Sequence, residues 1–166
     1  MNYKITQEDP KSKYLTIEAT LIANKKHEIE VQLPAWRPGR YELQNFAKNI
    51  QIFQAFTSDG VLLQVKKITK DRWRVITEKN ENIVFKYRYY ANQTDAGGSY
   101  FNKDFVYINP INCCVYGEDR LDEKCTVAVR GKKEQELAGG VSSTFVDDFH
   151  HFETTDFYHL VDLPFM

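Results

Sequence analysis

The chain has 166 residues, which is long enough for one domain with its own hydrophobic core. Its hydrophobic content of 42% and charged content of 27% are ordinary for a folded globular protein, and they exclude an intrinsically disordered chain. The formal net charge of −1 offers no basic surface, and no apolar stretch is long enough to span a bilayer, so we expect neither a nucleic-acid partner nor a membrane.

The compartment is indicated by the N-terminus and the cysteines. Residues 1–6 lack the apolar core of a secretion signal, so we expect a cytoplasmic protein. Cys113, Cys114 and Cys125 are odd in number and lack the spacing of a metal knuckle, which favours reduced and partly buried thiols. A disulfide from Cys125 to Cys113 or Cys114 across a hairpin is the alternative.

Two alternating segments near the N-terminus predict a hairpin. Tyr14 to Ile22 and His27 to Leu33 both alternate apolar and polar residues, as half-buried strands do. The polar residues 24–26 between them are typical of a turn. The pattern therefore predicts an antiparallel pair formed by these two strands.

Three shorter strands are predicted next. Asn49 to Phe56 should form a strand with Ile50, Ile52 and Phe53 turned inward. Ser58-Asp59-Gly60 is typical of a hairpin turn, after which residues 61–67 return and residues 72–76 form a further strand.

The segment from Ile83 to Ala91 is the most aromatic strand of the chain. Alternation places Phe85, Tyr87 and Tyr89 on one face and Val84 and Tyr90 on the other. Aromatic residues continue as far as residue 107. We favour a sheet core with a half-exposed rim, and the alternative is a platform for carbohydrate or peptide in a free-standing binding module.

The remaining chain completes an all-β pattern. Residues 95–99 predict a loop and residues 137–151 a long irregular connection, and further strands are expected at residues 105–108, 112–116, 123–129 and 157–161. About ten short strands without a long helix predict one domain over residues 1–166. Its fold should be an antiparallel β-sandwich or a saddle-shaped pair of sheets.

The sequence lacks the motifs typical of metal-dependent, nucleophilic or phosphate-binding sites. His27-Glu28-Ile29-Glu30-Val31 begins the His-Glu-x-x-His motif of zinc peptidases but ends in valine, and its period is that of a strand. For His150, His151 and His159 we favour a solvated loop over a metal site. The chain contains neither a Gly-x-Ser-x-Gly nucleophile elbow nor a phosphate-binding loop. We therefore predict no catalytic residue, no metal and no cofactor within this domain.

The most unusual segment is Leu33-Pro34-Ala35-Trp36-Arg37-Pro38-Gly39-Arg40-Tyr41. Both prolines fix φ and end the preceding strand, and Gly39 permits the positive φ of a Pro-Gly turn. We expect a rigid structural corner built from Pro34, Trp36, Pro38, Gly39 and Tyr41, with Trp36 covering one end of the core. The alternative is a wall of a substrate cleft or an interdomain contact.

This segment, followed by Phe46-Ala47-Lys48-Asn49-Ile50, resembles the N-terminal domain of the glycyl aminopeptidase family, metallopeptidase family sixty-one. Trp73-Arg74-Val75 and residues 84–91 also resemble it, and residues 158–164 are similar to the family's junction into its catalytic domain. The resemblance implies a β-rich, non-catalytic domain that packs against a separate zinc-binding catalytic domain. We therefore expect the chain to end at a domain boundary.

The resemblance also implies partners. The catalytic domain of the same parent protein would be the main one, its zinc would be the cofactor, and a peptide would be the substrate. We expect the region from Asp95 to Asn112 to bound the peptide cleft or contact the catalytic domain, with Tyr107, Asn109 and Asn112 supplying hydrogen bonds.

Overall fold

The computed structural model describes residues 1–22, 26–37, 39–77, 82–95 and 97–166. Its helical elements are short: η1 (Phe46–Asn49), α1 (Pro110–Cys113), η2 (Glu118–Arg120) and α2 (Phe157–Val161). No described helix has the length and apolar character needed to cross a membrane. The strands are β1 (Asn2–Gln7), β2 (Tyr14–Leu21), β3 (Glu28–Gln32), β4 (Ile50–Thr57), β5 (Leu62–Leu63), β6 (Val65–Lys67), β7 (Arg72–Ile76), β8 (Ile83–Tyr90), β9 (Tyr100–Phe101), β10 (Val106–Tyr107), β11 (Cys125–Arg130), β12 (Thr144–Val146) and β13 (Phe149–Thr154).

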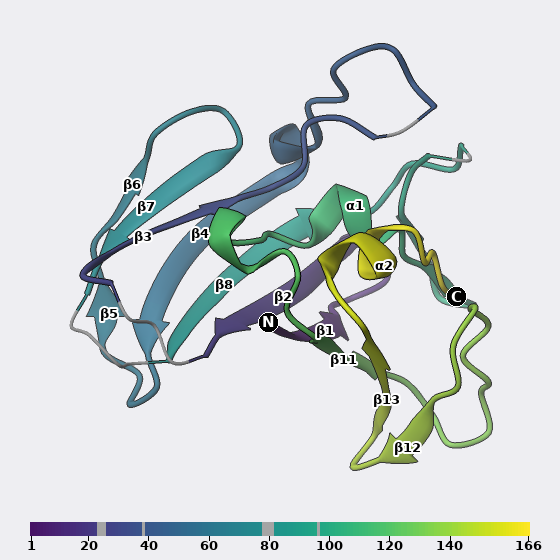
Figure 1. Ribbon diagram of the computed structural model, residues 1–166. Coiled ribbons are helices and arrows are strands. Elements are labelled where there is room, and N and C mark those ends of the chain that lie inside the picture. Colours follow the sequence, from purple (N-terminus) through teal and green to yellow (C-terminus); the bar gives the residue numbers. More distant parts are fainter. Residues whose placement is uncertain (23–25, 38, 78–81, 96) are drawn as a thin grey trace.

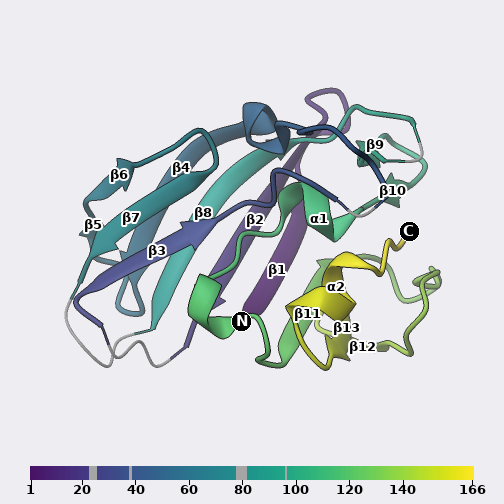
Figure 2. The same cartoon turned by 45° about the horizontal axis from the view of Figure 1, so that its top comes forward.

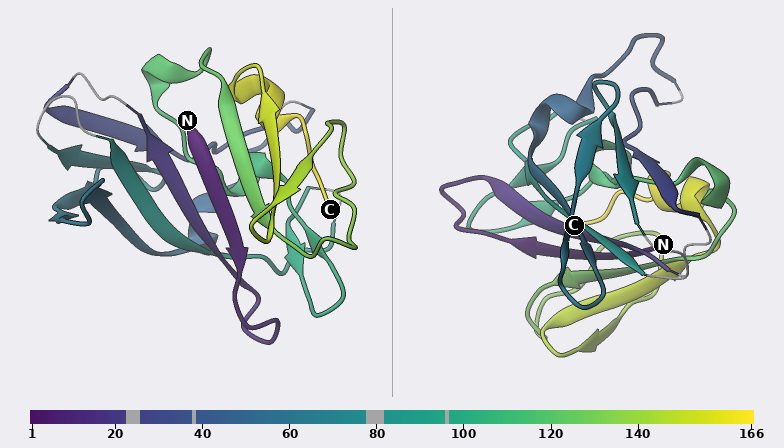
Figure 3. Two further views of the ribbon diagram at one scale, coloured as in Figure 1. Left: turned by 90° about the horizontal axis from the view of Figure 1, so that it is seen from below. Right: turned by 90° about the vertical axis from the view of Figure 1, so that its left-hand side faces the viewer.

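The strands form one large sheet and two small ones. The large sheet has the order β12-β13-β11-β1-β2-β8-β4-β5, and the small ones are β3-β7-β6 and β10-β9. The three-stranded sheet lies over the β4 and β8 end of the large sheet, while α1 and α2 lie over the rest of the same face (Figures 1 and 2). The predicted all-β fold with paired sheets is confirmed, with one addition: β1 runs parallel to β11 (Figure 3).

Period-two alternation builds the core between these layers. The inward residues of β2 are completely or almost completely buried, and the predicted aromatic face of β8 is buried as well. Phe53 of β4 stacks on Trp73 of β7 with ring centroids 4.2 Å apart, which joins the large sheet to the three-stranded one. Aromatic stacking of this kind adds to the burial of apolar area that holds the layers together.

The predicted hairpin of the second and third strands is wrong. β2 pairs with β1 on one side and β8 on the other, whereas β3 pairs with β7 in the smaller sheet. Both strands bury one face, so their alternation is equally compatible with one sheet or with two facing sheets. Residues 24 and 25 of the predicted turn lie outside the described part of the chain.

β4 departs from the predicted alternation at Ile52. Ile50 and Phe53 pack against the core, but Ile52 is 56% exposed and has a φ of 53°. The pairing register with β8 shifts between Gln51 and Gln54, which marks a β-bulge. The bulge inserts a residue and turns Ile52 outward, so the inward position predicted for it is wrong.

Two predicted strands are helical turns. Residues 112–116 overlap α1, which begins with Pro110 at its first helical position, and residues 157–161 form α2. The Asp156 carboxylate caps α2 by accepting a 2.7 Å hydrogen bond from the His159 amide. Within the predicted irregular connection, β12 and the first half of β13 form a hairpin on the edge of the large sheet. Pro110 and Asp156 were the signs of a helix start in the sequence. The apolar runs themselves are too short to distinguish a helix from a strand.

Buried tyrosines tie the large sheet to the segment that follows α1. The Tyr87 hydroxyl donates to the Cys113 carbonyl at 2.6 Å, and the Tyr3 hydroxyl donates to the Val115 carbonyl at 2.8 Å. Burial raises the pKa of both phenols well above the usual value, so they stay neutral donors. The three cysteines are buried and free, which confirms the prediction of reduced thiols and excludes the disulfide alternative.

Candidate functional site

Residues 34–45, which we call the signature loop, project from the fold between β3 and η1 (Figure 1). Trp36 is 48% exposed, and Tyr41 and Leu43 are 99% and 79% exposed. Gly39 has the positive φ, 82°, expected of a Pro-Gly turn. Pro38 lies outside the described residues. Large exposed apolar side chains on one projecting loop are typical of a contact surface.

The base of the signature loop meets residues 93–99. Arg37 lies against the backbone of Gly97, where an added β-carbon would be 3.0 Å from the guanidinium carbon. Asp95 organises this second loop by accepting hydrogen bonds from Gln93 Nε2 at 2.7 Å and from the Gly97 amide at 2.8 Å. These bonds, led by the one from Gln93, lower the pKa of Asp95, and the charges of Arg40 and Arg37 add to the effect.

Two of the three predicted hydrogen-bonding residues converge behind this loop. Asn112 Nδ2 donates to the Gly97 carbonyl at 2.8 Å, and the backbone N–H of Asn109 donates to Ser99 Oγ at 3.0 Å. Asn109 and Asn112 are both buried, so they shape the loop from beneath. The third, Tyr107, is half-buried on β10, opposite Tyr100 of β9.

Asn112 also carries an unusual atom. Its Oδ1 is buried without a hydrogen-bond partner, and it is the one such side-chain atom found in the described part of the chain. A buried acceptor without a donor costs free energy, so structures that retain one generally have a reason at that position. Arg37, Gly97, Ser99, Asn109 and Asn112 together form what we call the Arg37–Asn112 cluster.

The sequence interpretation missed Ser99 and the contact between Arg37 and Gly97. It treated residues 97–99 as a plain loop, although Ser99 is buried and a β-carbon on Gly98 would lie 2.5 Å from the Gln93 carbonyl oxygen. The run Gly97-Gly98-Ser99 was the available signal, because small residues in series mark close approach of backbone.

The histidines do not converge. His150 is buried with Nε2 3.2 Å from the Lys132 carbonyl, His151 is exposed on the opposite face of β13, and His159 lies on α2. In the described ranges no three His, Cys, Asp or Glu side chains gather as a ligand set.

The aromatic region divides between core and rim. Tyr87, Tyr89 and Phe101 are buried, whereas Tyr90 and Phe105 are exposed at the surface. Tyr100 packs on Phe105 with centroids 5.7 Å apart. The distribution agrees with the favoured interpretation of a core with a half-exposed rim.

Comparison with known proteins covers the whole chain. A family model described as the Peptidase M61 N-terminal domain matches residues 2–166. An aminopeptidase N family protein from Idiomarina loihiensis has a similar structure, with a TM-score of 0.88 and 26% identity over 99% of this chain and 28% of that chain. No match is found among curated proteins.

More distant structures share the fold alone. An M1 zinc metallopeptidase from Deinococcus radiodurans has a TM-score of 0.50 at 11% identity, and native yeast LTA4 hydrolase has a TM-score of 0.51 at 11% identity. This chain is covered to 99% in both comparisons, but it spans only 40% and 28% of those chains.

Proposed function

Because the chain belongs to the family of Peptidase M61 N-terminal domains, we propose that it is the non-catalytic N-terminal domain of a zinc metallo-aminopeptidase. In this proposal it packs against the catalytic domain of the same protein and bounds one end of the peptide cleft. The zinc and the residues that activate water belong to that second domain. A domain with this role needs a surface that the partner domain can bury.

The signature loop is the observation that carries the proposal. Trp36, Tyr41 and Leu43 present large apolar side chains to water on a segment that projects beyond the large sheet and the three-stranded sheet. Burying apolar area on association is favourable by roughly 25 cal/mol per Å², and aromatic residues are enriched at the centres of protein interfaces. We assign these three side chains to the contact with the catalytic domain.

The Arg37–Asn112 cluster supports the loop from behind. Asn112 and Asn109 are buried and fix Gly97 and Ser99, so we assign them a positioning role rather than direct contact with substrate. Tyr107 is the partly exposed member of the predicted trio, and its hydroxyl is the group we expect to meet the peptide or the catalytic domain.

The test uses the protein in which the catalytic domain is present. Replacing Trp36 and Tyr41 together by alanine should raise KM for peptide hydrolysis severalfold or separate the two domains, while the bound zinc is unchanged. Val61→Ala with Leu62→Ala is the matched control, because both are exposed apolar side chains at the β4–β5 edge of the large sheet. Unaltered kinetics and an intact domain contact in the double variant would remove the assignment.

A further inference from the structure

Two cations lie around one aromatic ring on the outer face of the large sheet. Lys4 Nζ lies 4.9 Å and Arg130 Cζ 5.8 Å from the centroid of the Phe149 ring. The three residues belong to β1, β11 and β13, with β11 in the middle. Lys4 is exposed between two buried residues of its strand, so its side chain crosses the outer surface of β11 to reach the ring.

Neither cation forms an ion pair with a carboxylate in the described part of the chain. The acidic neighbours on this face already have partners: Glu18, opposite Lys4 in β2, pairs with Lys86 at 3.0 Å, and Glu153 pairs with Lys124. Two like charges close together repel each other, and attraction to an aromatic ring offsets this only in part. A net charge of −1 does not reveal such a local group, which is suited to an anion.

A polar pocket of about 600 Å³ adjoins the two cations. Its floor is formed by outward positions of β11 and β13: Thr126, Ala128, His151 and Glu153. Lys4 is the neighbour of Ala128 in β1, and the His151 ring lies 6.3 Å from the Phe149 ring. The cations and the pocket, which we call the outer pocket, therefore form one continuous surface.

The outer pocket also offers hydroxyl groups that are not used by the protein. The side-chain hydroxyls of Thr126, Ser142 and Thr144 make no hydrogen bond within the described ranges, so each is able to donate and to accept. His151 adds a ring nitrogen and Glu153 a carboxylate acceptor. Hydroxyl groups of a ligand donate and accept in the same way, so this lining fits a polyol better than an apolar molecule.

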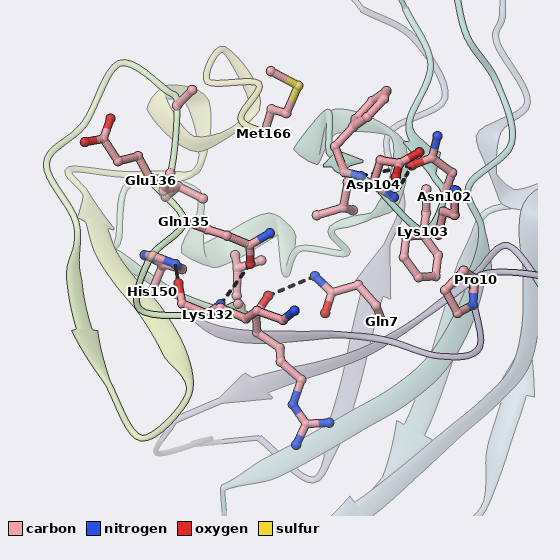
Figure 4. A pocket seen from close by; sticks show the side chains of 18 of the residues that line it. Gln7, Pro10, Asn102, Lys103, Asp104, Lys132, Gln135, Glu136, His150 and Met166 are labelled. Carbon is pink, nitrogen blue, oxygen red and sulfur yellow. Dashed lines mark hydrogen bonds between the residues drawn. The ribbon is translucent and has the colours of Figure 1, made fainter.

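A second hollow lacks this combination. It has a volume of about 740 Å³ and lies at the end of β11, beside His150 and Met166 (Figure 4). Charged residues of both signs line it: Lys103, Asp104, Lys132 and Glu136. Its mixed charges do not select an anion, whereas the outer pocket combines two cations without acidic partners and a wall of hydroxyl groups.

We propose that Lys4, Arg130 and the outer pocket bind a small phosphorylated polyol, such as a sugar phosphate. A phosphate ester carries about −1.5 to −2 charges at pH 7, which matches two cations better than a single carboxylate does. The Arg130 guanidinium donates two parallel hydrogen bonds to the phosphate, and Lys4 adds a point charge. The hydroxyl groups of the ligand then lie over Ala128. This site goes beyond the proposed function and does not depend on it, because it uses neither the signature loop nor a second domain.

Isothermal titration calorimetry of the 166-residue chain at low ionic strength tests the proposal. The probes are glycerol 3-phosphate and glucose 6-phosphate, compared with glycerol, glucose and inorganic phosphate. At least one ester should bind about tenfold more tightly than inorganic phosphate and than its own neutral polyol, because only the ester engages both parts of the site. Added sodium chloride should weaken this binding by screening the charges.

A double variant tests the role of the cations. Lys4→Gln with Arg130→Gln should weaken binding of the ester by about tenfold or more, because both charged donors are lost. Lys48→Gln with Lys66→Gln is the matched control. Both of these lysines are exposed on other elements, η1 and β6, and their replacement changes the net charge by the same amount.

A second double variant tests the hydroxyl wall. Ser142→Ala with Thr144→Val should weaken binding of the ester severalfold and leave the affinity for inorganic phosphate unchanged, because only contacts to the polyol are removed. Both side chains are exposed, as are Lys4 and Arg130, so the thermal midpoints of all variants should stay close to that of the wild type.

Three results would overturn the inference. The first is that neither ester binds. The second is equal affinity for the esters and for inorganic phosphate, since the outer pocket would then contribute nothing. The third is a loss of affinity in the control variant, Lys48→Gln with Lys66→Gln, as large as in Lys4→Gln with Arg130→Gln, which would show attraction to the net charge of the protein rather than to this site.

Discussion

The Arg37 guanidinium lies on the backbone of Gly97, whose carbonyl oxygen in turn accepts a 2.8 Å hydrogen bond from Asn112. This contact joins the base of the signature loop to α1 through residues 95–99. The loop is therefore anchored at its base, although its outer side chains lie in water. An anchored base and an exposed tip suit a surface that is formed before its partner binds.

Two adjacent glycines should respond differently to alanine. The new methyl group of Gly98→Ala would lie 2.5 Å from the Gln93 carbonyl oxygen, which is backbone, whereas that of Gly97→Ala would lie 3.0 Å from the end of the Arg37 side chain, which can shift more easily than backbone. Overpacking of this kind costs about 1–3 kcal/mol, so Gly98→Ala should lower the free energy of unfolding by that amount. Urea denaturation of both variants measures this, and equal stabilities would contradict the description of this loop.

The two tryptophans of the chain should differ even more. Trp73 is buried and stacked on Phe53, so Trp73→Ala should cost about 3–5 kcal/mol. Trp36 is half exposed, and Trp36→Ala should change the stability of the 166-residue chain by less than about 0.5 kcal/mol. Thermal unfolding of the two variants decides whether the signature loop supports the core, because a large loss in Trp36→Ala would favour the structural-corner interpretation over a contact surface.

Removing the Tyr87 hydroxyl should weaken the contact between the layers. The Tyr87 hydroxyl donates to the Cys113 carbonyl at 2.6 Å and accepts from the Val115 backbone N–H at 3.3 Å, and both hydrogen bonds are buried. Tyr87→Phe leaves both buried backbone groups without this partner, for a loss of about 1–3 kcal/mol. Tyr90→Phe is the control on the exposed face of the same strand and should be nearly neutral in chemical denaturation.

The ion pair of Glu8 and Arg88 should make stability depend on pH. Hydrogen bonds from Arg88, at 2.7 and 2.5 Å, lower the pKa of Glu8, and the bond from Thr16 adds to this. A carboxyl with a lowered folded pKa stabilises the protein above its unfolded pKa, near 4.3, and loses that contribution as the pH falls through the folded value. Glu8→Gln should therefore cost about 1 kcal/mol at pH 7.

The same substitution should cost nothing once the wild-type carboxyl is protonated. Unfolding curves recorded between pH 7 and pH 3 should show the wild type and Glu8→Gln converging at the acid end. The exposed Glu134→Gln serves as the control. A difference that stays constant across this range would show that the effect is steric.

Much of the fold could be predicted because the alternation of apolar and polar residues in a half-buried strand shows which of its faces is buried. The alternation in residues 14–21 and 83–90 predicted which side chains are buried, and the structure places them in the core. The pairing of strands could not be predicted in the same way. The alternation in β3 is compatible with pairing to β2, and only the structure shows that β3 pairs with β7 instead. The bulge at Ile52 is a register effect that no local pattern contains.

The candidate site was predicted in part. Asn109 and Asn112 were named because they lie in the expected region, but their burial beneath Gly97 and Ser99 depends on contacts between distant segments. The signature loop was recognised as unusual from its prolines and glycine. Its exposure could not be predicted, because tryptophan and tyrosine are as common in cores as at interfaces.

The parallel pairing of β1 with β11 has a consequence for how the chain acquires its fold. Tyr3 pairs with Val127, so the second neighbour of β1 becomes available only after most of the chain has been synthesised. Until then β1 is the open edge of a growing sheet, and such edges attract unwanted strands. The large sequence separation of these contacts predicts that the large sheet is completed slowly and late. Productive folding at the ribosome therefore depends on the pairing of residues 125–130 with β1.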